Sequence, residues 1–199
     1  MIAFAPPGPA ESRRLLARLA RPASEVAPAL LGHVLLRRSG RRVLAARIVE
    51  AEAYLPTGDP GAHVFHGRTP RTAPLFGPPG SIYVYVIYGI YHCLNLAVDR
   101  KGVPGCVLIR AAELLEADDK DACRGPGRLC RTLGLTRRDS GANLFAPGAR
   151  LVLREGEAPR QIGSSRRIGV HEGAEHVLRF FDTSSASVSG PRRARASLV

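Results

Sequence analysis

Residues 82–98 constrain the fold more than any other part of the sequence. They read Ile-Tyr-Val-Tyr-Val-Ile-Tyr, then Gly89, then Ile-Tyr-His-Cys-Leu-Asn-Leu-Ala-Val. β-Branched and aromatic residues at this density are typical of strands, and a glycine between two such runs predicts a hairpin turn. We therefore expect a fold built around an antiparallel sheet.

The rest of the chain supplies further strands and a smaller number of helices. Apolar periodicity predicts helices at 11–20, 24–31, 114–121 and 126–133. Strands are predicted at 33–38, 41–55, 105–112, 151–154, 167–170 and 178–181. Helices followed by many strands favour a single α+β domain over 1–199, with its core at about 11–182 and flexible ends at 1–10 and 183–199.

A long loop rich in proline and glycine spans residues 56–81, and Thr69-Pro70 are expected to begin a short helix within it. Loops of this length inside a compact domain are usually functional. His63 and His66 lie in this loop without a clear third ligand, so we expect hydrogen bonding to a ligand and neither a metal nor another cofactor. The cysteines form no Cys-x-x-Cys pair and are expected to be reduced packing residues.

The charge of the chain indicates a polyanionic partner. Lys and Arg total 29 against 17 Asp and Glu, for a formal net charge of +12, and all but Lys101 and Lys120 of those 29 are arginine. Such a balance favours nucleic acid, although a GC-rich genome that favours arginine codons is an alternative. No apolar run approaches the about 18 residues of a membrane span, so we expect a cytoplasmic protein without a membrane partner.

Two carboxylates and an aromatic ring alternate along the predicted strand at 41–55. Successive strand residues point to opposite faces, so Glu50, Glu52 and Tyr54 share one face, and Val49, Ala51 and Ala53 the other. The pattern fits a catalytic carboxylate beside an aromatic, or a solvated polar face. The residues alone do not distinguish Glu50 from Glu52 as the catalytic group.

The tyrosines are concentrated near the predicted hairpin. Four of the five occur within nine positions; the full set is Tyr54, Tyr83, Tyr85, Tyr88 and Tyr91. Aromatic faces in a basic protein can stack on nucleobases, although tyrosine is also common in ordinary strands. Tyr88 precedes Gly89 at the hairpin tip, where its ring is expected to be exposed and able to wedge between bases.

Two polar residues lie in predicted apolar strands, and a Gly-Pro-Gly-Arg motif begins a predicted helix. Arg110 ends an apolar strand and is expected to be partly buried and paired with a carboxylate. Asn95 lies inside another apolar strand, where a structural hydrogen-bonding role is an alternative to a site role. Gly125-Pro-Gly-Arg resembles a phosphate-binding helix entry, a weak signal by itself.

Several motifs occur in an order and spacing that match a known family. They are Arg-Ile-Val-Glu-Ala-Glu-Ala-Tyr at 47–54 and the segments 62–63, 69–71, 79–91, 93–95, 106–111 and 125–130. Together they resemble the alkyladenine (3-methyladenine) DNA glycosylases of the mammalian type, from about residue 24 to 182. The resemblance implies a curved antiparallel sheet with surrounding helices, a β-hairpin that enters the DNA minor groove, and excision of damaged purines from double-stranded DNA.

The resemblance also implies a role for individual residues. Glu52 corresponds to the general base and Arg110 to its partner in holding the water. The flipped-base pocket would be walled by Tyr54, His63 and Tyr85, with Asn95 beside it, bearing on guanine discrimination, and Tyr88 as the intercalating wedge. Residues 167–182 resemble the family less closely, and His171-Glu172-Gly173 falls where the far side of the pocket would be.

Two other functions fit parts of the sequence. A non-catalytic nucleic-acid-binding protein would use the basic charge and the tyrosines without a particular carboxylate. An RNA-directed nuclease or glycosidase would also bind a polyanion, but a nuclease generally needs a metal cluster that these carboxylates do not form. We expect a monomeric enzyme that leaves an abasic site without cutting the strand.

Overall fold

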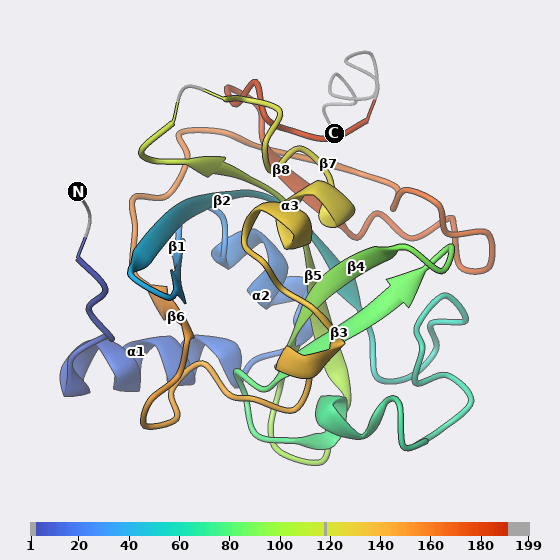
Figure 1. Cartoon of the computed structure of the whole chain (residues 1–199). Coiled ribbons are helices and arrows are strands. Elements are labelled where there is room, and N and C mark those ends of the chain that lie inside the picture. The colour runs from blue at the N-terminus through green and yellow to red at the C-terminus, as the bar shows by residue number, and fades with distance from the viewer. Residues whose placement is uncertain (1–2, 118, 191–199) are drawn as a thin grey trace.

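The strand-rich sequence folds into one curled antiparallel sheet with helices around it (Figure 1). A computed structural model describes residues 3–117 and 119–190. The eight strands are β1 (Val34–Ser39), β2 (Arg42–Tyr54), β3 (Ile82–Ile87), β4 (Tyr91–Val98), β5 (Gly105–Leu114), β6 (Leu151–Arg154), β7 (Ile162–Ser165) and β8 (Arg179–Asp182). The helices are α1 (Pro9–Leu19), α2 (Ala23–Ala29) and α3 (Pro126–Thr132), with 3-10 turns η1 (Ala73–Phe76) and η2 (Arg137–Asp139). No helix in this part of the chain has the length and apolar character needed to span a bilayer.

Strand β2 connects the two halves of the sheet. One edge of β2 pairs with β5, and the other pairs with β1 at one end and with β8 at the other. The pairing with β5 shifts register between Ile48 and Ala51. This irregularity sends Ile48 and Ala51 into the main core and Val49 into a separate cluster with Phe181. The expectation that Val49 shares a face with Ala51 is therefore wrong, because strict alternation fails at a bulge.

The main hydrophobic core joins the sheet to the helices. Leu15 and Leu19 lie one turn apart on α1 and are both buried, while α2 contributes Val26 and α3 contributes Leu129. Figure 1 shows α2 behind the sheet and α3 in front of it. The cysteines are free and buried, which confirms their role as packing residues.

The β3–β4 hairpin projects from the sheet and confirms the prediction for residues 82–98 (Figure 1). Ile87 pairs with Tyr91, so Tyr88, Gly89 and Ile90 form the tip. Tyr88 and Gly89 have φ angles of 53° and 73°, the left-handed values that a tight two-residue hairpin turn requires. The Tyr88 side chain is 82% exposed, as expected for a tip residue.

Three predicted elements differ from the structure. The helix predicted at 114–121 is absent from the described residues there, because β5 runs on to Leu114 and the Leu115 N–H bonds to the Ala45 carbonyl. The strand predicted at 167–170 is a loop, and the strand that pairs with β8 is β7 instead. The short helix expected from Thr69-Pro70 begins only at η1.

Both ends of the described chain are better packed than expected. Phe4 packs against a small apolar cluster, and α1 already begins at Pro9. Within 183–190, Val188 and Ser189 are buried, and the Ser189 N–H bonds to Glu50. Residues 183–190 are thus packed against the sheet, and the predicted flexibility of the two ends stays a prediction; residues 1–2 and 191–199 lie outside the described residues.

Candidate active site

Glu52 is the most enclosed carboxylate of the predicted set. Its Oε2 accepts hydrogen bonds from the Tyr54 hydroxyl at 3.1 Å and from Arg110 Nη1 at 3.3 Å. Its Oε1 accepts one from the backbone N–H of Ile168 at 2.8 Å. The carboxylate is 0% exposed in this arrangement, at the point where β2, β5 and the loop after β7 meet.

The surroundings of Glu52 act on its pKa in both directions. Burial raises the pKa above its usual value, and the Glu50 charge adds to this rise. The Arg110 guanidinium, the Ile168 N–H and the Tyr54 hydroxyl oppose it by stabilising the charged form. The carboxyl group is thus held with a raised pKa beside a cation, an arrangement suited to accepting a proton.

Glu50 lies on the same side of β2 but is bonded differently. Its Oε1 accepts from Arg179 Nε at 2.6 Å and from Ser189 Oγ at 2.9 Å, and its Oε2 accepts from the Ser189 N–H at 2.6 Å. Arg110 Nε lies 3.3 Å from the same Oε1. Glu50 is therefore enclosed by protein groups. Neither carboxylate itself lines the cavities described below, but Glu52 bonds to Tyr54, which lines both of them.

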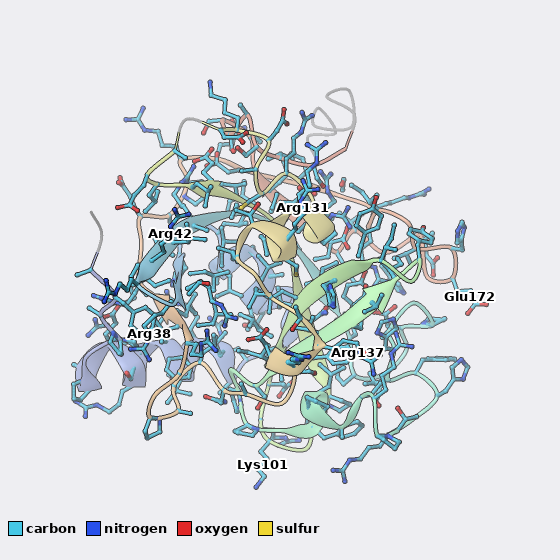
Figure 2. All side chains as sticks on the ribbon, in the orientation of Figure 1. Arg38, Arg42, Lys101, Arg131, Arg137 and Glu172 are labelled. Atoms are coloured by element: carbon cyan, nitrogen blue, oxygen red, sulfur yellow. The ribbon has the colours of Figure 1, made fainter. Side chains whose placement is uncertain are left out.

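A cavity of about 420 Å³ opens beside Tyr54. Its walls come from β2, β3, β4, the loop before η1 and the loop after β7; they include Tyr54, Gly61, His63, Arg71, Tyr85, Asn95 and His171-Glu172. The two loops touch at Gly61, where a Cβ would lie 2.6 Å from Val170 Cγ1. Figure 2 shows Glu172 at the outer edge of this wall.

Aromatic rings form one side of this cavity. The His63 and Tyr85 rings meet edge to face with centroids 4.4 Å apart, and His63 Nδ1 lies 3.1 Å from the Tyr83 hydroxyl. Arg71 lies over the Tyr85 ring at 5.6 Å, and Arg167 over the Tyr54 ring at 4.5 Å. Partial burial of the ring and the Arg71 charge lower the pKa of His63 to about 4. This favours a neutral imidazole at pH 7, although the residue also faces the cavity.

Asn95 lies beneath these rings. It is buried, and its Nδ2 donates to the carbonyl oxygens of Tyr83 and Cys93 at 3.3 and 3.4 Å. The same residue lines the cavity. The structural and the site interpretation of Asn95 are thus compatible.

A second cavity, of about 400 Å³, adjoins the first. It is lined by Arg110, by the hairpin residues Tyr88 and Tyr91, and by the entry of α3 at Gly125–Arg128. Tyr54 and Tyr85 line both cavities, so their side chains lie between them. The two hollows together make a space next to Glu52 with an exposed aromatic at its mouth.

Comparison with known proteins decides between the classes of function left open by the sequence. The family model described as "Methylpurine-DNA glycosylase (MPG)" matches residues 17–186, which is most of the chain. The chain belongs to the methylpurine-DNA glycosylase family. It is therefore a DNA glycosylase, a hydrolase of N-glycosyl bonds that acts in the repair of alkylated purines, and neither a non-catalytic binding protein nor a nuclease.

Individual relatives in bacteria and archaea are similar along most of their length. A protein of Anaeromyxobacter dehalogenans is 45% identical over 177 residues, covering 86% of this chain and 84% of the relative. One from Synechococcus elongatus is 43% identical over 181 residues, covering 89% and 92%. One from Methanocella arvoryzae is 40% identical over 184 residues, covering 85% and 92%. Each carries the name "Putative 3-methyladenine DNA glycosylase".

The glycosylase fold brings most of the predicted site residues together. Glu52 and Arg110 are in contact, and Tyr54, His63, Tyr85 and Asn95 line one cavity; their roles stay predictions. His66 does not line that cavity. No group of three or more His, Cys, Asp or Glu that could hold a metal ion occurs within 3–117 or 119–190.

Sequence reasoning missed the groups that anchor the site from a distance. Arg167 pairs with Asp59 at 2.6 Å with both side chains fully buried, and this pair ties the loop after β7 to the loop after β2. Ser189 and Arg179 hold Glu50 from the C-terminal part of the chain. The only available signal was an arginine in an otherwise apolar run at Leu178-Arg-Phe-Phe.

Proposed function

We propose that this glycosylase flips alkylated or deaminated purines, 3-methyladenine among them, out of duplex DNA and hydrolyses the bond between base and sugar. A water activated by Glu52 would be the nucleophile, and an abasic site the product. The observation that carries the proposal is the Glu52 carboxylate, held by Arg110 Nη1 at 3.3 Å directly beside the Tyr54-lined cavities.

The chemistry requires a carboxylate at this position. As the purine departs, the sugar develops oxocarbenium-like positive charge, which a nearby carboxylate stabilises. The same carboxylate can take a proton from the attacking water. Arg110 lines the second cavity while bonded to Glu52, so its guanidinium can contact the water or the sugar that enters there.

The first cavity suits an extruded purine. Tyr54 and Tyr85 offer aromatic faces, and electron-rich rings favour the positive charge of an alkylated purine. Neutral His63 can exchange a hydrogen bond with the base without adding a positive charge. Asn95 would bear on the exclusion of guanine from the floor of the same cavity.

The DNA itself would be held by charge and by the hairpin tip. The chain carries a formal net charge of +12, which suits the phosphate backbone of a duplex bound by one protein molecule. Tyr88 projects from the tip beside both cavities, where its ring can fill the gap that a flipped nucleotide leaves.

A lesion assay tests the proposal. DNA methylated with dimethyl sulfate, or a duplex with one hypoxanthine, is incubated with enzyme and EDTA, and the released base and abasic sites are quantified. We expect Glu52→Gln to lower excision by at least about 100-fold with lesion-DNA binding retained. Excision by Glu52→Gln at the wild-type rate, above all if Glu50→Gln is silent, would show that Glu52 is not the base.

A further inference from the structure

Glu50 has no part in the proposed chemistry, yet it is one of the most completely bonded side chains in the protein. It is 0% exposed and accepts three hydrogen bonds of 2.6 to 2.9 Å, from Arg179 and from two groups of Ser189. Ser189 is 139 residues away in the sequence. A buried carboxylate is costly unless it is paired, so this environment needs an explanation.

Arg110 links Glu50 to the catalytic carboxylate. Arg110 Nε lies 3.3 Å from Glu50 Oε1 and donates to Ser189 Oγ at 3.3 Å, while its Nη1 donates to Glu52 Oε2. Its Nη2 has no hydrogen-bond partner among the residues that the structure describes, and the guanidinium lines the second cavity. One edge of the guanidinium is thus fixed, one nitrogen holds Glu52, and one is left for a ligand.

The fixed edge matters because arginine has many rotamers. A guanidinium held only through Glu52 could pivot about that contact, and small displacements at a reacting centre cost large factors in rate. Glu50 and Ser189 remove this freedom. Arg179 in turn neutralises Glu50, so the cluster of Glu50, Glu52, Arg110 and Arg179 buries two negative and two positive charges.

We propose that Glu50 is a positioning residue for excision, acting through Arg110, and that Ser189 shares this positioning role. The proposal rests on the proposed role of Glu52 as the base. The competing explanation is purely structural: Glu50 would serve only to neutralise Arg179, which is 0% exposed and bonds to Ser165 as well.

Two serines of the same segment provide a matched pair of variants. Ser189→Ala removes the hydroxyl that joins Glu50 to Arg110. Ser187→Ala makes the same change two residues away, at a buried hydroxyl that has no hydrogen-bond partner within 3–117 and 119–190. Single-turnover excision of a lesion duplex is measured across pH for both variants, together with thermal unfolding and lesion-DNA binding.

The rate constant and the pH profile separate positioning from stability. Loss of folded enzyme lowers the amplitude of a single turnover, whereas a misplaced Arg110 lowers the rate constant. We expect Ser189→Ala to lower the rate constant about 10-fold and to move the acidic limb of the profile to higher pH. The limb moves because Arg110 is the cation that opposes the rise in the pKa of Glu52. The other charged or titratable groups that face Glu52 are Glu50, Tyr54 and Arg167. Ser187→Ala should change neither quantity, and equal behaviour of the two variants would overturn the proposal.

A charge-balanced variant tests the structural explanation directly. Glu50→Gln alone leaves Arg179 buried without its counter-charge, so it is compared with Glu50→Gln combined with Arg179→Met, which removes both charges. We expect the double variant to recover thermal stability and to stay at least about 10-fold slower than wild type. Recovery of the wild-type rate constant would reduce Glu50 to a counter-ion of Arg179. Retention of excision by Glu52→Gln would instead overturn the role of Glu52, whatever the serine variants do.

Discussion

Tyr54 combines two functions in one side chain. Its ring lines both cavities and lies under Arg167, and its hydroxyl donates to Glu52 Oε2 at 3.1 Å. Burial raises the pKa of Tyr54 far above its usual value, so the hydroxyl keeps its proton and remains a donor. The proposed stacking on the base and the bond to the carboxylate would therefore depend on different atoms of the same residue.

Tyr54→Phe separates these two functions. The variant keeps the ring and removes a hydrogen bond that lowers the pKa of Glu52. That pKa should rise further, because one hydrogen bond to the charged form is lost. Because excision is lost as pH falls through the pKa of Glu52, the acidic limb of the rate profile should move to higher pH. If the acidic limb does not move, a group other than Glu52 determines its position. Lesion-DNA binding is the control and should be unchanged.

The sequence predicted part of this site because part of it is local. Alternation along one strand placed Glu52 beside Tyr54, and the position of Arg110 at the end of an apolar strand predicted its pairing with a carboxylate, which is confirmed. The Arg167–Asp59 pair and the Ser189 contact have no local pattern, because their partners lie 108 and 139 residues apart. Such pairs arise only when the sheet curls and brings distant loops together.

The β3–β4 hairpin projects from the sheet (Figure 1). Two consecutive positive φ angles at Tyr88 and Gly89 make a tight turn, and a tyrosine in this conformation costs of order 1 kcal/mol or more relative to glycine. Tyr88 and Ile90 are also the most exposed large hydrophobic side chains that the structure describes. A strained, exposed aromatic at a tip is a feature that folding alone does not require.

Tyr88→Ala should leave the fold intact and slow excision from duplex DNA. Alanine keeps a Cβ at the left-handed position, so thermal unfolding should be nearly unchanged. A ring stacked in the vacated position contributes about 1–3 kcal/mol, which corresponds to a loss of roughly 5- to 150-fold in rate. The loss should be smaller with a mispaired lesion, because less stacking is broken. An equal loss on paired and mispaired duplexes would argue against a wedge.

The elements that the sequence failed to predict share a physical cause. Residues 114–121 are polar enough for a helix, but β2 offers an open edge that extends β5 to Leu114. Residues 162–165 include a glycine and two serines and show no alternation, yet they pair with β8 because that edge is also open. Short strands at sheet edges are set by available partners more than by their own composition.

At the scale of the whole molecule, the arginines fall into a buried, paired group and a solvent-exposed group. Some arginines are neutralised inside the protein, as in the pairs Arg167–Asp59 and Arg179–Glu50. Others point into solvent, including Arg131 and Arg137, which Figure 2 shows on one face. The solvent-facing arginines are the ones available to phosphate.

DNA affinity should therefore fall steeply with salt. Each phosphate contact releases counterions, and even two contacts give about a tenfold loss of affinity between roughly 50 and 200 mM salt. The measurement is a binding titration of an undamaged duplex with Glu52→Gln, so that no product accumulates. A flat affinity over this range would show that phosphate contacts do not dominate.

The protein should leave the abasic strand uncut. A glycosylase that also cleaves the strand generally uses an amine to form a Schiff base, and Lys101 and Lys120 are the only lysines. Neither lines the two cavities, and Figure 2 shows Lys101 at the bottom of the molecule and Glu172 at its right edge. Borohydride should trap no covalent adduct with lesion DNA. A trapped adduct that survives blocking of the N-terminal amine would contradict this expectation.

Two kinds of structure line the first cavity. Strands β2, β3 and β4 contribute Tyr54, Tyr85 and Asn95, whereas Gly61 and Val170-His-Glu172 come from two loops joined by the buried Arg167–Asp59 pair. The first loop is fixed by buried Ala62 and Val64, but His171 and Glu172 of the second loop are exposed and can be exchanged without disturbing the core or the carboxylate. We therefore expect a laboratory library confined to 171–172 to alter which lesions are accepted while the reaction itself stays the same.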